Sequence, residues 1–214
     1  MTGGRVEAEL KFRAEDERPL ELLEGALALG PAALGPPRTV SERDRYLDTA
    51  DLHLSAAGWA CRLRTREGRT IVSLKGPAEH ASGDPVQRRR EVEGPAEFAA
   101  EAARWPPSPA RELLLRLTDG EPLVERFILE QQRTERSASV GVRRIGLLSL
   151  DRVRLLHQGV EIGRMAIVEL EFEPVALAAG VDPAPLAAAL SGVPGLVVDP
   201  STKFARALGL LAGG

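Results

Sequence analysis

The lysines of this chain are few, and they stand at positions suited to chemistry. Only three of its 28 Lys and Arg residues are lysines, namely Lys11, Lys75 and Lys203. Lys11 follows the alternating acids Glu7 and Glu9, and Lys75 ends a segment of similar alternation. A lysine ammonium is a compact, strongly hydrated point charge, whereas an arginine guanidinium is a planar fork. In a chain that otherwise uses arginine, these three positions are candidates for a phosphate site.

Two pairs of glutamates have the spacing of a metal site. Glu7 and Glu9 form one Glu-x-Glu pair near the N-terminus, and Glu169 and Glu171 form another late in the chain. In a strand, such residues share one face, where they repel each other unless a cation lies between them. Glutamate also forms strands poorly, so packing alone does not favour this pattern. Carboxylate oxygens are suited to Mg²⁺, Mn²⁺ or Ca²⁺, and the pairs therefore predict a divalent-metal site.

Charge alternates with apolar residues in five segments, at residues 6–12, 59–64, 72–75, 89–93 and 168–173. A single amphipathic strand most often has a solvated polar face. Five of them favour a shared polar interior instead. If the sheet closes with its charged faces inward, acids from the first and last long strands meet bases from the middle ones. Helices would then cover the outer, apolar face of a polar-lined barrel.

The ordered set of these residues resembles the CYTH domain, or triphosphate tunnel metalloenzyme, superfamily, and in particular its inorganic triphosphatases. The residues that carry the resemblance are Glu7-Ala8-Glu9-Leu10-Lys11, Arg62-x-Arg64, Lys75, Glu169-x-Glu171 and Ser201-Thr202-Lys203. Their order and approximate spacing fit from about residue 5 to 210. The resemblance implies an α+β fold built on a closed antiparallel eight-stranded β-barrel, a tunnel with a charged interior and helices packed outside.

The resemblance also implies roles for individual residues. Asp151, Lys11 and Arg62 match catalytic positions. Metal ligands for Mg²⁺ or Mn²⁺ are implied at Glu7, Glu9, Asp151, Glu169 and Glu171. Phosphate-binding bases are implied at Lys11, Arg62, Arg64, Lys75, Arg89, Arg133 and Lys203. Gln131 stands where many relatives have a further lysine.

The function that this resemblance favours is metal-dependent hydrolysis of a triphosphate phosphoanhydride bond, with inorganic tripolyphosphate giving pyrophosphate and phosphate. Three alternatives remain: a class IV-type adenylyl cyclase that converts ATP to cyclic AMP, a thiamine triphosphatase, and a non-catalytic polyphosphate-binding module. Aromatic residues make up 4% of the chain, and Trp59 and Phe12 fall on apolar faces. We therefore expect no aromatic platform for a nucleotide base, which favours the hydrolase over the cyclase.

Composition predicts one globular domain over residues 1–214, with 43% hydrophobic and 28% charged residues. We find no apolar run long enough for a membrane helix, and the first expected strand leaves no room for a signal peptide, so we expect a cytoplasmic protein without a membrane partner. A net charge of −3 and a pI near 5.8 argue against a nucleic-acid partner. The expected partner is a small-molecule triphosphate.

The single cysteine and the three histidines do not suggest a site of their own. Cys61 falls on an apolar face and is expected to be a packed thiol. His53, His80 and His157 share no zinc-site spacing and are expected at the surface.

The elements that must position these residues follow from periodicity and turn signals. Strands are expected at residues 5–13, 42–47, 59–66, 69–75, 89–93, 123–137, 147–156 and 161–175. Helices are expected from about residue 16 to 29, from Asp48-Thr49 to Gly58, and at 95–104, 109–117, 182–190 and 201–211. Residues 30–37 and 76–85 are expected to be irregular, and Glu67-Gly68 and residues 157–159 are expected to turn.

Overall fold

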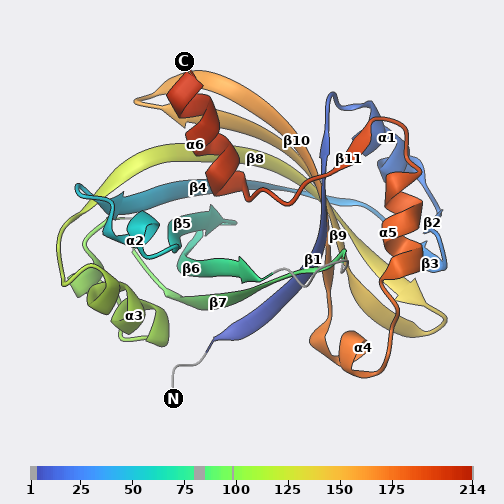
Figure 1. The fold of residues 1–214 in the computed structure, drawn as a ribbon, viewed down its shortest axis with the longest axis horizontal. Coiled ribbons are helices and arrows are strands. Elements are labelled where there is room, and N and C mark those ends of the chain that lie inside the picture. The colour runs from blue at the N-terminus through green and yellow to red at the C-terminus, as the bar shows by residue number, and fades with distance from the viewer. Residues whose placement is uncertain (1–3, 80–84, 98, 214) are drawn as a thin grey trace.

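The computed structural model describes residues 4–79, 85–97 and 99–213. Eight long strands form its main body: β1 (Arg5–Ala14), β4 (Arg38–Thr49), β5 (Ala60–Arg66), β6 (Arg69–Glu79), β7 (Gln87–Pro95), β8 (Leu123–Val140), β9 (Arg143–His157) and β10 (Val160–Phe172). They pair antiparallel in the order β8-β4-β5-β6-β7-β1-β10-β9, and β9 pairs again with β8. This last pairing closes the sheet, so the expected eight-stranded antiparallel barrel is confirmed (Figure 1).

Shorter elements surround the barrel. Three short strands, β2 (Ala28–Leu29), β3 (Ala32–Leu34) and β11 (Leu196–Val198), extend its edges. The helices are α1 (Arg18–Gly25), α2 (His53–Ala56), the 3-10 helix η1 (Ala102–Arg104), α3 (Pro109–Leu117), α4 (Pro174–Ala178), α5 (Ala184–Ser191) and α6 (Lys203–Gly213). Figure 1 shows α1 and α5 on one side of the barrel and α2 and α3 on the other. No helix among the described residues is long and apolar enough to cross a membrane.

Two apolar cores lie between the outer face of the barrel and these helices. The first contains Leu20 and Leu23 of α1 and Leu186 of α5, packed with residues of β1, β9 and β10. The second contains Leu114 of α3 and Cys61 of β5. Since alternate strand residues point to opposite faces, burying these side chains outside turns their charged neighbours inward. Cys61 is fully buried, as expected, and burial raises the pKa of its thiol.

The third apolar core lies at one end of the barrel interior. Tyr46, Leu129 and Val153 share strand parity with the inward-facing acids and bases, and α6 covers them with Ala207 and Phe204. The expected helices outside the barrel are confirmed, and α6 in addition covers this end of its interior. An inner end lined by apolar side chains needs a cover, and the apolar face of α6 supplies it.

Two hairpin turns lie at the positions that the sequence predicted. Glu67 and Gly68 join β5 to β6 with φ values of 49° and 77°, and Gln158 and Gly159 join β9 to β10 with 50° and 80°. Two successive residues with positive φ match the right-handed twist of the strands they connect. These turns fix the register that brings charged residues from distant strands to one level of the barrel.

Several element boundaries differ from the sequence-based expectation. Helix α1 ends at Gly25 rather than near residue 29, and the expected irregular stretch after it contains the small hairpin of β2 and β3. The expected helix at 95–104 is reduced to η1, because β7 continues to Pro95. Strand β6 runs to Glu79, into the expected 76–85 loop; residues 80–84, including His80, lie outside the described residues. Neither α4 nor β11 was predicted.

The end of α1 has an unusual cap that explains the early stop. Arg136, on the outward face of β8, donates hydrogen bonds to the backbone oxygens of Leu23, Glu24 and Ala26 at 2.6–3.0 Å, and to Gly35 at 2.8 Å. The last carbonyls of a helix have no partner within the helix. A buried guanidinium with five donors satisfies them here, so Arg136 joins α1 to the barrel.

Candidate functional site

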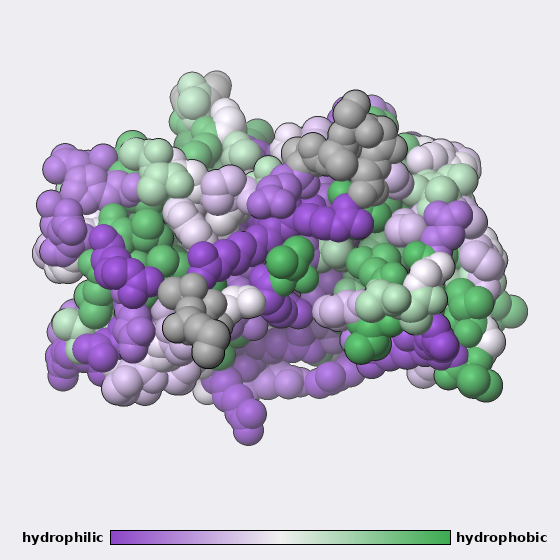
Figure 2. Space-filling view, turned by 60° about the horizontal axis from the view of Figure 1, so that its bottom comes forward, coloured by the Kyte–Doolittle hydropathy of each residue, from purple (hydrophilic) through white to green (hydrophobic). Residues whose placement is uncertain are grey.

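The barrel interior contains a charged cavity with about 750 Å³ of empty space, including open solvent at its mouth. Figure 2 shows hydrophilic side chains gathered around a hollow at the centre of the face in view. Eight basic and six acidic side chains of the described residues line the cavity. They are Arg5, Lys11, Arg62, Arg64, Lys75, Arg89, Arg133, Lys203, Glu7, Glu9, Glu91, Glu93, Glu169 and Glu171. A cavity with both signs of charge suits a ligand that combines anionic and cationic groups.

The structure brings the predicted site residues together. Eleven of the twelve line the cavity, from β1, β5, β6, β7, β8, β10 and α6. The twelfth, Asp151 of β9, is fully buried behind the lining. Lys203 Nζ lies 2.5 Å and Arg133 Nε 2.7 Å from its carboxylate oxygens. Although burial opposes ionisation, Arg133 and Lys203 hold the pKa of Asp151 below its usual value.

Strand register explains how the two Glu-x-Glu pairs meet. Strands β1 and β10 are neighbours, with Glu9 opposite Glu171 and Lys11 opposite Glu169. On its other side β1 pairs with β7, which places Glu7 opposite Arg89. Because residues of one parity face inward, four carboxylates from two strands gather in one part of the tunnel.

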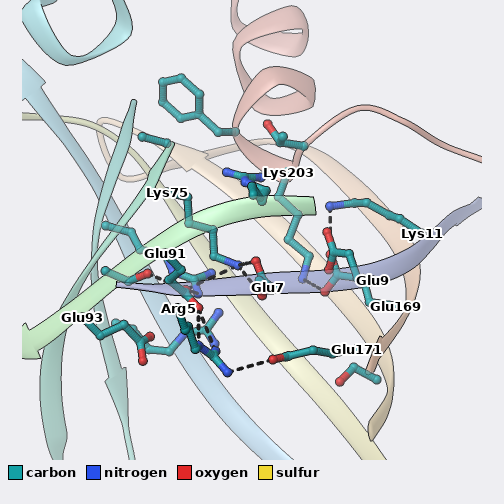
Figure 3. A pocket seen from close by; sticks show the side chains of 18 of the residues that line it. Arg5, Glu7, Glu9, Lys11, Lys75, Glu91, Glu93, Glu169, Glu171 and Lys203 are labelled. Carbon is teal, nitrogen blue, oxygen red and sulfur yellow. Dashed lines mark hydrogen bonds and ion pairs between the residues drawn. The ribbon is translucent and has the colours of Figure 1, made fainter. Parts of the chain in front are cut away.

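Each of the three lysines contacts a carboxylate of the predicted metal set. Lys75 Nζ lies 2.5 Å from Glu7 Oε2, and Lys11 Nζ lies 2.8 Å from Glu169 Oε1. Lys203 Nζ contacts Asp151 at 2.5 Å. It also contacts Glu169, at 2.9 Å (Figure 3). Burial disfavours the charge on Lys11, but Glu169 and Glu9 raise its pKa above the usual value. In the absence of ligand, the predicted phosphate-binding lysines therefore neutralise the predicted metal ligands.

Glu9 lacks such a partner. It is 5% exposed, and no described residue makes a hydrogen bond or ion pair with its carboxylate. Burial and the charge of Glu169 raise the pKa of Glu9 to about 7. Burial and Glu7 likewise raise the pKa of Glu171. The nearby charges of Lys11 and Lys75 only partly offset this repulsion. A buried carboxylate that repels its neighbours and lacks an ion pair fits a divalent ion, whose binding would relieve the repulsion.

Arg89 is a buried base with an unused hydrogen-bond donor, whereas Glu9 is a buried acid without an ion pair. It is 6% exposed, lines the cavity, and its Nε has no hydrogen-bond partner among the described residues. Arg62 Nε is also buried without a partner in that part of the chain. A buried guanidinium with unused donors favours an oxyanion ligand, because leaving the donors unpaired costs free energy.

Asp44 was not predicted from the sequence, and it positions the two cavity arginines Arg62 and Arg64. It is fully buried and accepts hydrogen bonds from Arg64 at 2.7 and 2.8 Å, Arg62 at 3.2 Å and Gln131 at 2.8 Å. Burial opposes its charge, but Arg64 and Arg62 lower the pKa of Asp44. Gln131 thus supports the same carboxylate that holds the two arginines. The missed signal was the run Glu42-Arg43-Asp44-Arg45, in which both faces are charged and parity alone does not identify the inner one.

Two aromatic side chains also reach the cavity, although the sequence indicated no aromatic platform for a base. Tyr46 and Phe204 line it. The ring centroids of Tyr46 and Phe127 lie 4.7 Å apart in a stacked arrangement, and Phe204 lies 5.5 Å from Tyr46. The sequence pattern did not reveal this cluster because its members come from β4, β8 and α6. Tyr46 is only 5% exposed, so most of its ring is already covered by protein.

One further acidic group lies at the surface. Ligand atoms of Asp51, His53 and Glu121 lie within 4.8 Å of one another, and none of the three residues lines the tunnel. The group is exposed or half-exposed, and such groups are common without an ion. We assign no function to it. His53 and His157 are both half-buried, and His157 Nδ1 lies 2.9 Å from the backbone oxygen of Arg126.

Comparison with known proteins agrees with this architecture. The family model of the CYTH domain matches residues 5–175. No match was found among curated protein sequences.

Solved structures share the fold at low sequence identity. HpAC1 of Hippeastrum, described as a candidate adenylyl cyclase with a dominant triphosphatase activity, is 21% identical with a TM-score of 0.66, over 95% of each chain. A candidate adenylate cyclase of Bacillus halodurans is 20% identical with a TM-score of 0.60, over 94% of this chain and 97% of the other. The PH1819 protein of Pyrococcus horikoshii is 16% identical with a TM-score of 0.52, over 94% and 98%.

Proposed function

Because this chain belongs to the CYTH domain family, we propose that it is a metal-dependent triphosphatase that hydrolyses inorganic tripolyphosphate to pyrophosphate and phosphate. The observation that carries the proposal is a pair of unsatisfied charges in one tunnel. The Glu9 carboxylate makes no hydrogen bond or ion pair with the described residues, and the Arg89 guanidinium has an unused donor there. A divalent ion and a polyphosphate together would satisfy both.

The carboxylates would hold the metal. Glu7, Glu9, Glu169 and Glu171 would bind one Mg²⁺ or Mn²⁺, and Asp151 would bind a second. When bound, the ions supply Lewis-acid stabilisation of the phosphoryl oxygens and acidify water. Glu7, Glu169 and Asp151 are paired with lysines in the structure, so these pairs would have to open for a metal to bind.

The bases would hold the phosphates. Lys11, Lys75 and Lys203 would move from carboxylate to phosphate oxygens, while Arg62, Arg64, Arg89 and Arg133 donate charge-assisted hydrogen bonds. Lys11 and Arg62 would act on the reacting group by stabilising charge that develops on its oxygens. Water attacks the terminal phosphorus, the bond from that phosphorus to the bridging oxygen breaks, and pyrophosphate leaves with the bonding electron pair.

The partner exchange has a thermodynamic consequence. If the metal binds alone, it takes the carboxylates and leaves the lysines without ion-pair partners. If the triphosphate binds alone, it takes the lysines and leaves the carboxylates without ion-pair partners. Buried unpaired charges are costly, so each ligand should bind more tightly when the other is present.

The direct test compares wild-type protein with Glu9→Gln and Glu169→Gln. With Mg²⁺ or Mn²⁺, wild-type protein should release phosphate from tripolyphosphate, and chelation of the metal should stop the release. Both variants should fold, as judged by circular dichroism, and lose hydrolysis. Near wild-type turnover in either folded variant would remove the metal assignment. Tight binding of tripolyphosphate without turnover under any metal would instead identify a polyphosphate-binding module.

A second candidate is an adenylyl cyclase that acts on ATP in the same site. The Tyr46 and Phe204 rings at the cavity favour it, because aromatic rings can stack on a base. We place it second because Tyr46 is nearly covered and already stacked on Phe127, which leaves little free ring face. A triphosphate attached to thiamine would depend on the same rings.

A further inference from the structure

Arg5 joins two acids at the mouth of the tunnel (Figure 3). Its Nη2 and Nε lie 2.7 and 3.1 Å from Glu91 Oε2, and its Nη1 lies 2.9 Å from Glu171 Oε1. Glu91 is the cross-strand neighbour of Arg5 in β7, whereas Glu171 lies in β10, on the other side of β1. One guanidinium therefore connects the strands that flank β1.

Arg5 differs from the lysines that neutralise the other carboxylates. Its side chain is 51% exposed, whereas those of Lys11 and Lys203 are 3% and 6% exposed. A half-exposed arginine can change rotamer without disturbing the core. The interaction it makes with Glu171 is part of an exposed pair, and such pairs are weak enough to be exchanged.

We propose that Arg5 is a resident cation that competes with the divalent metal for Glu171, and so sets the metal concentration at which the site fills. This inference rests on the proposed metal-dependent function. Glu171 cannot serve the guanidinium and the metal with the same oxygen, and a positive charge next to the cluster repels a divalent ion. Metal binding is therefore favoured when Arg5 leaves Glu171, even though the contact occupies only Oε1 of that carboxylate.

Glu93 offers Arg5 a second position. It is exposed, lines the same mouth, and its charge favours the charged form of Arg5. Glu91 and Glu93 share one face of β7, because they are two residues apart. Arg5 can thus keep its contact with Glu91 while its other nitrogen turns from Glu171 toward Glu93.

The alternative is that Arg5 is a phosphate ligand, and it predicts the opposite sign when the triphosphate analogue is present. Removing a phosphate ligand weakens triphosphate binding and therefore also the metal binding that the triphosphate supports. Removing a competing cation makes metal binding tighter.

The test measures Mn²⁺ binding directly, by electron paramagnetic resonance of the free ion, with and without non-hydrolysable imidotriphosphate. Arg5→Gln should bind Mn²⁺ about three to ten times more tightly than wild-type protein. Arg5→Lys keeps the charge and should stay within about twofold of wild type. Arg104→Gln removes an arginine of a surface ion pair with Glu101 and should change nothing.

A double-mutant cycle tests the second position of Arg5. Glu93→Gln should weaken Mn²⁺ binding when Arg5 is present and should have no effect in the Arg5→Gln background. A general loss of negative charge at the mouth would weaken binding in both backgrounds, which would refute the role of Glu93 as the alternative partner.

The outcomes separate this inference from the proposed function. Mn²⁺ binding to wild-type protein that is lost in Glu9→Gln supports the metal site by itself. If that holds and Arg5→Gln binds Mn²⁺ no more tightly than wild type, the resident-cation role is wrong. If wild-type protein binds no Mn²⁺ with or without the analogue, the proposed metal site fails and the role of Arg5 fails with it.

Discussion

At the residue scale, the scarcity of lysine has a structural counterpart. All three lysines lie in the tunnel lining, and each contacts a carboxylate at 2.5–2.9 Å. The sequence predicted that these positions need compact charges, and the burial of Lys11 and Lys203 gives the reason. A guanidinium is wider than an ammonium and would not fit between the same acids without displacing them.

Lys11→Arg and Lys75→Arg should therefore lower kcat/KM for tripolyphosphate by about tenfold to a hundredfold, although charge is kept. The measurement is steady-state phosphate release at saturating metal. Arg104→Lys, an exchange of the same two residue types at the surface, is the matched control and should have wild-type kinetics. Unchanged kinetics in both tunnel variants would mean that the lysine preference has no role in the reaction.

Glu9 should affect stability and activity in opposite directions. Its pKa in the folded protein, about 7, lies above the ordinary 4.5, so the folded state binds the proton more tightly than the unfolded state. The contribution of Glu9 to the stability of the metal-free protein should therefore fall as the pH rises from about 4.5 to 7 and stay constant above that range. Glu9→Gln should then be more stable at pH 8 by on the order of 1–3 kcal/mol, and the difference should vanish near pH 5.

Thermal unfolding of metal-free protein at pH 5 and pH 8 checks this, with Glu67→Gln at an exposed pair as control. If Glu9→Gln is no more stable than wild-type protein at pH 8, burial and the neighbouring charges do not destabilise the ionised Glu9 carboxylate.

At the element scale, α6 carries both the apolar cover of the barrel and Lys203, a residue of the proposed phosphate site. Ala207 is fully buried against Tyr46, Phe127 and Leu129 at the inner end of the barrel, and Lys203 begins the same helix. The packing of α6 thereby sets the position of the Lys203 ammonium at Asp151 and Glu169.

Ala207→Leu should overpack this contact, destabilise the protein by about 1–3 kcal/mol, and lower hydrolysis at temperatures where the variant is still folded. Ala205→Leu, on the exposed face of the same helix, is the matched control and should leave both properties near wild type. Unfolding by denaturant and phosphate release provide the two readouts. Full activity in folded Ala207→Leu protein would show that α6 only covers the barrel.

The inward-facing residues could be predicted for strands in which charged and apolar residues alternate strictly. They could not be predicted for the other elements. β1, β5 and β10 show one charged and one apolar face, so their inner residues could be assigned from the sequence. β4 carries Arg43 and Arg45 outward and Asp44 inward, and charge on both faces conceals which one is buried. The end of α1 depends on Arg136, which is more than a hundred residues away in sequence, and no local signal reports that cap.

At the scale of the whole molecule, closure of the barrel brings the inward-facing charged residues of separate strands into one site. Its closure by the pairing of β8 with β9 brings acids of β1 and β10 and bases of β5, β6, β7 and β8 around one cavity. Family resemblance predicted this closure and the set of residues. It did not predict that the bases and acids neutralise each other without ligand, since ion pairing depends on side-chain positions that neither spacing nor parity determines. Arg5 and the aromatic cluster were missed for the same reason.

We propose that this tunnel hydrolyses tripolyphosphate with a divalent metal. Most of the binding free energy should come from phosphate oxygens, so a nucleoside adds bulk with few matched contacts. The most direct test incubates the protein and Mg²⁺ or Mn²⁺ with tripolyphosphate and ATP at equal concentrations, and follows all products by phosphorus NMR. The account predicts that tripolyphosphate disappears first, giving equal amounts of pyrophosphate and phosphate, while ATP is largely spared. Preferential consumption of ATP, above all with cyclic AMP as its product, would contradict it.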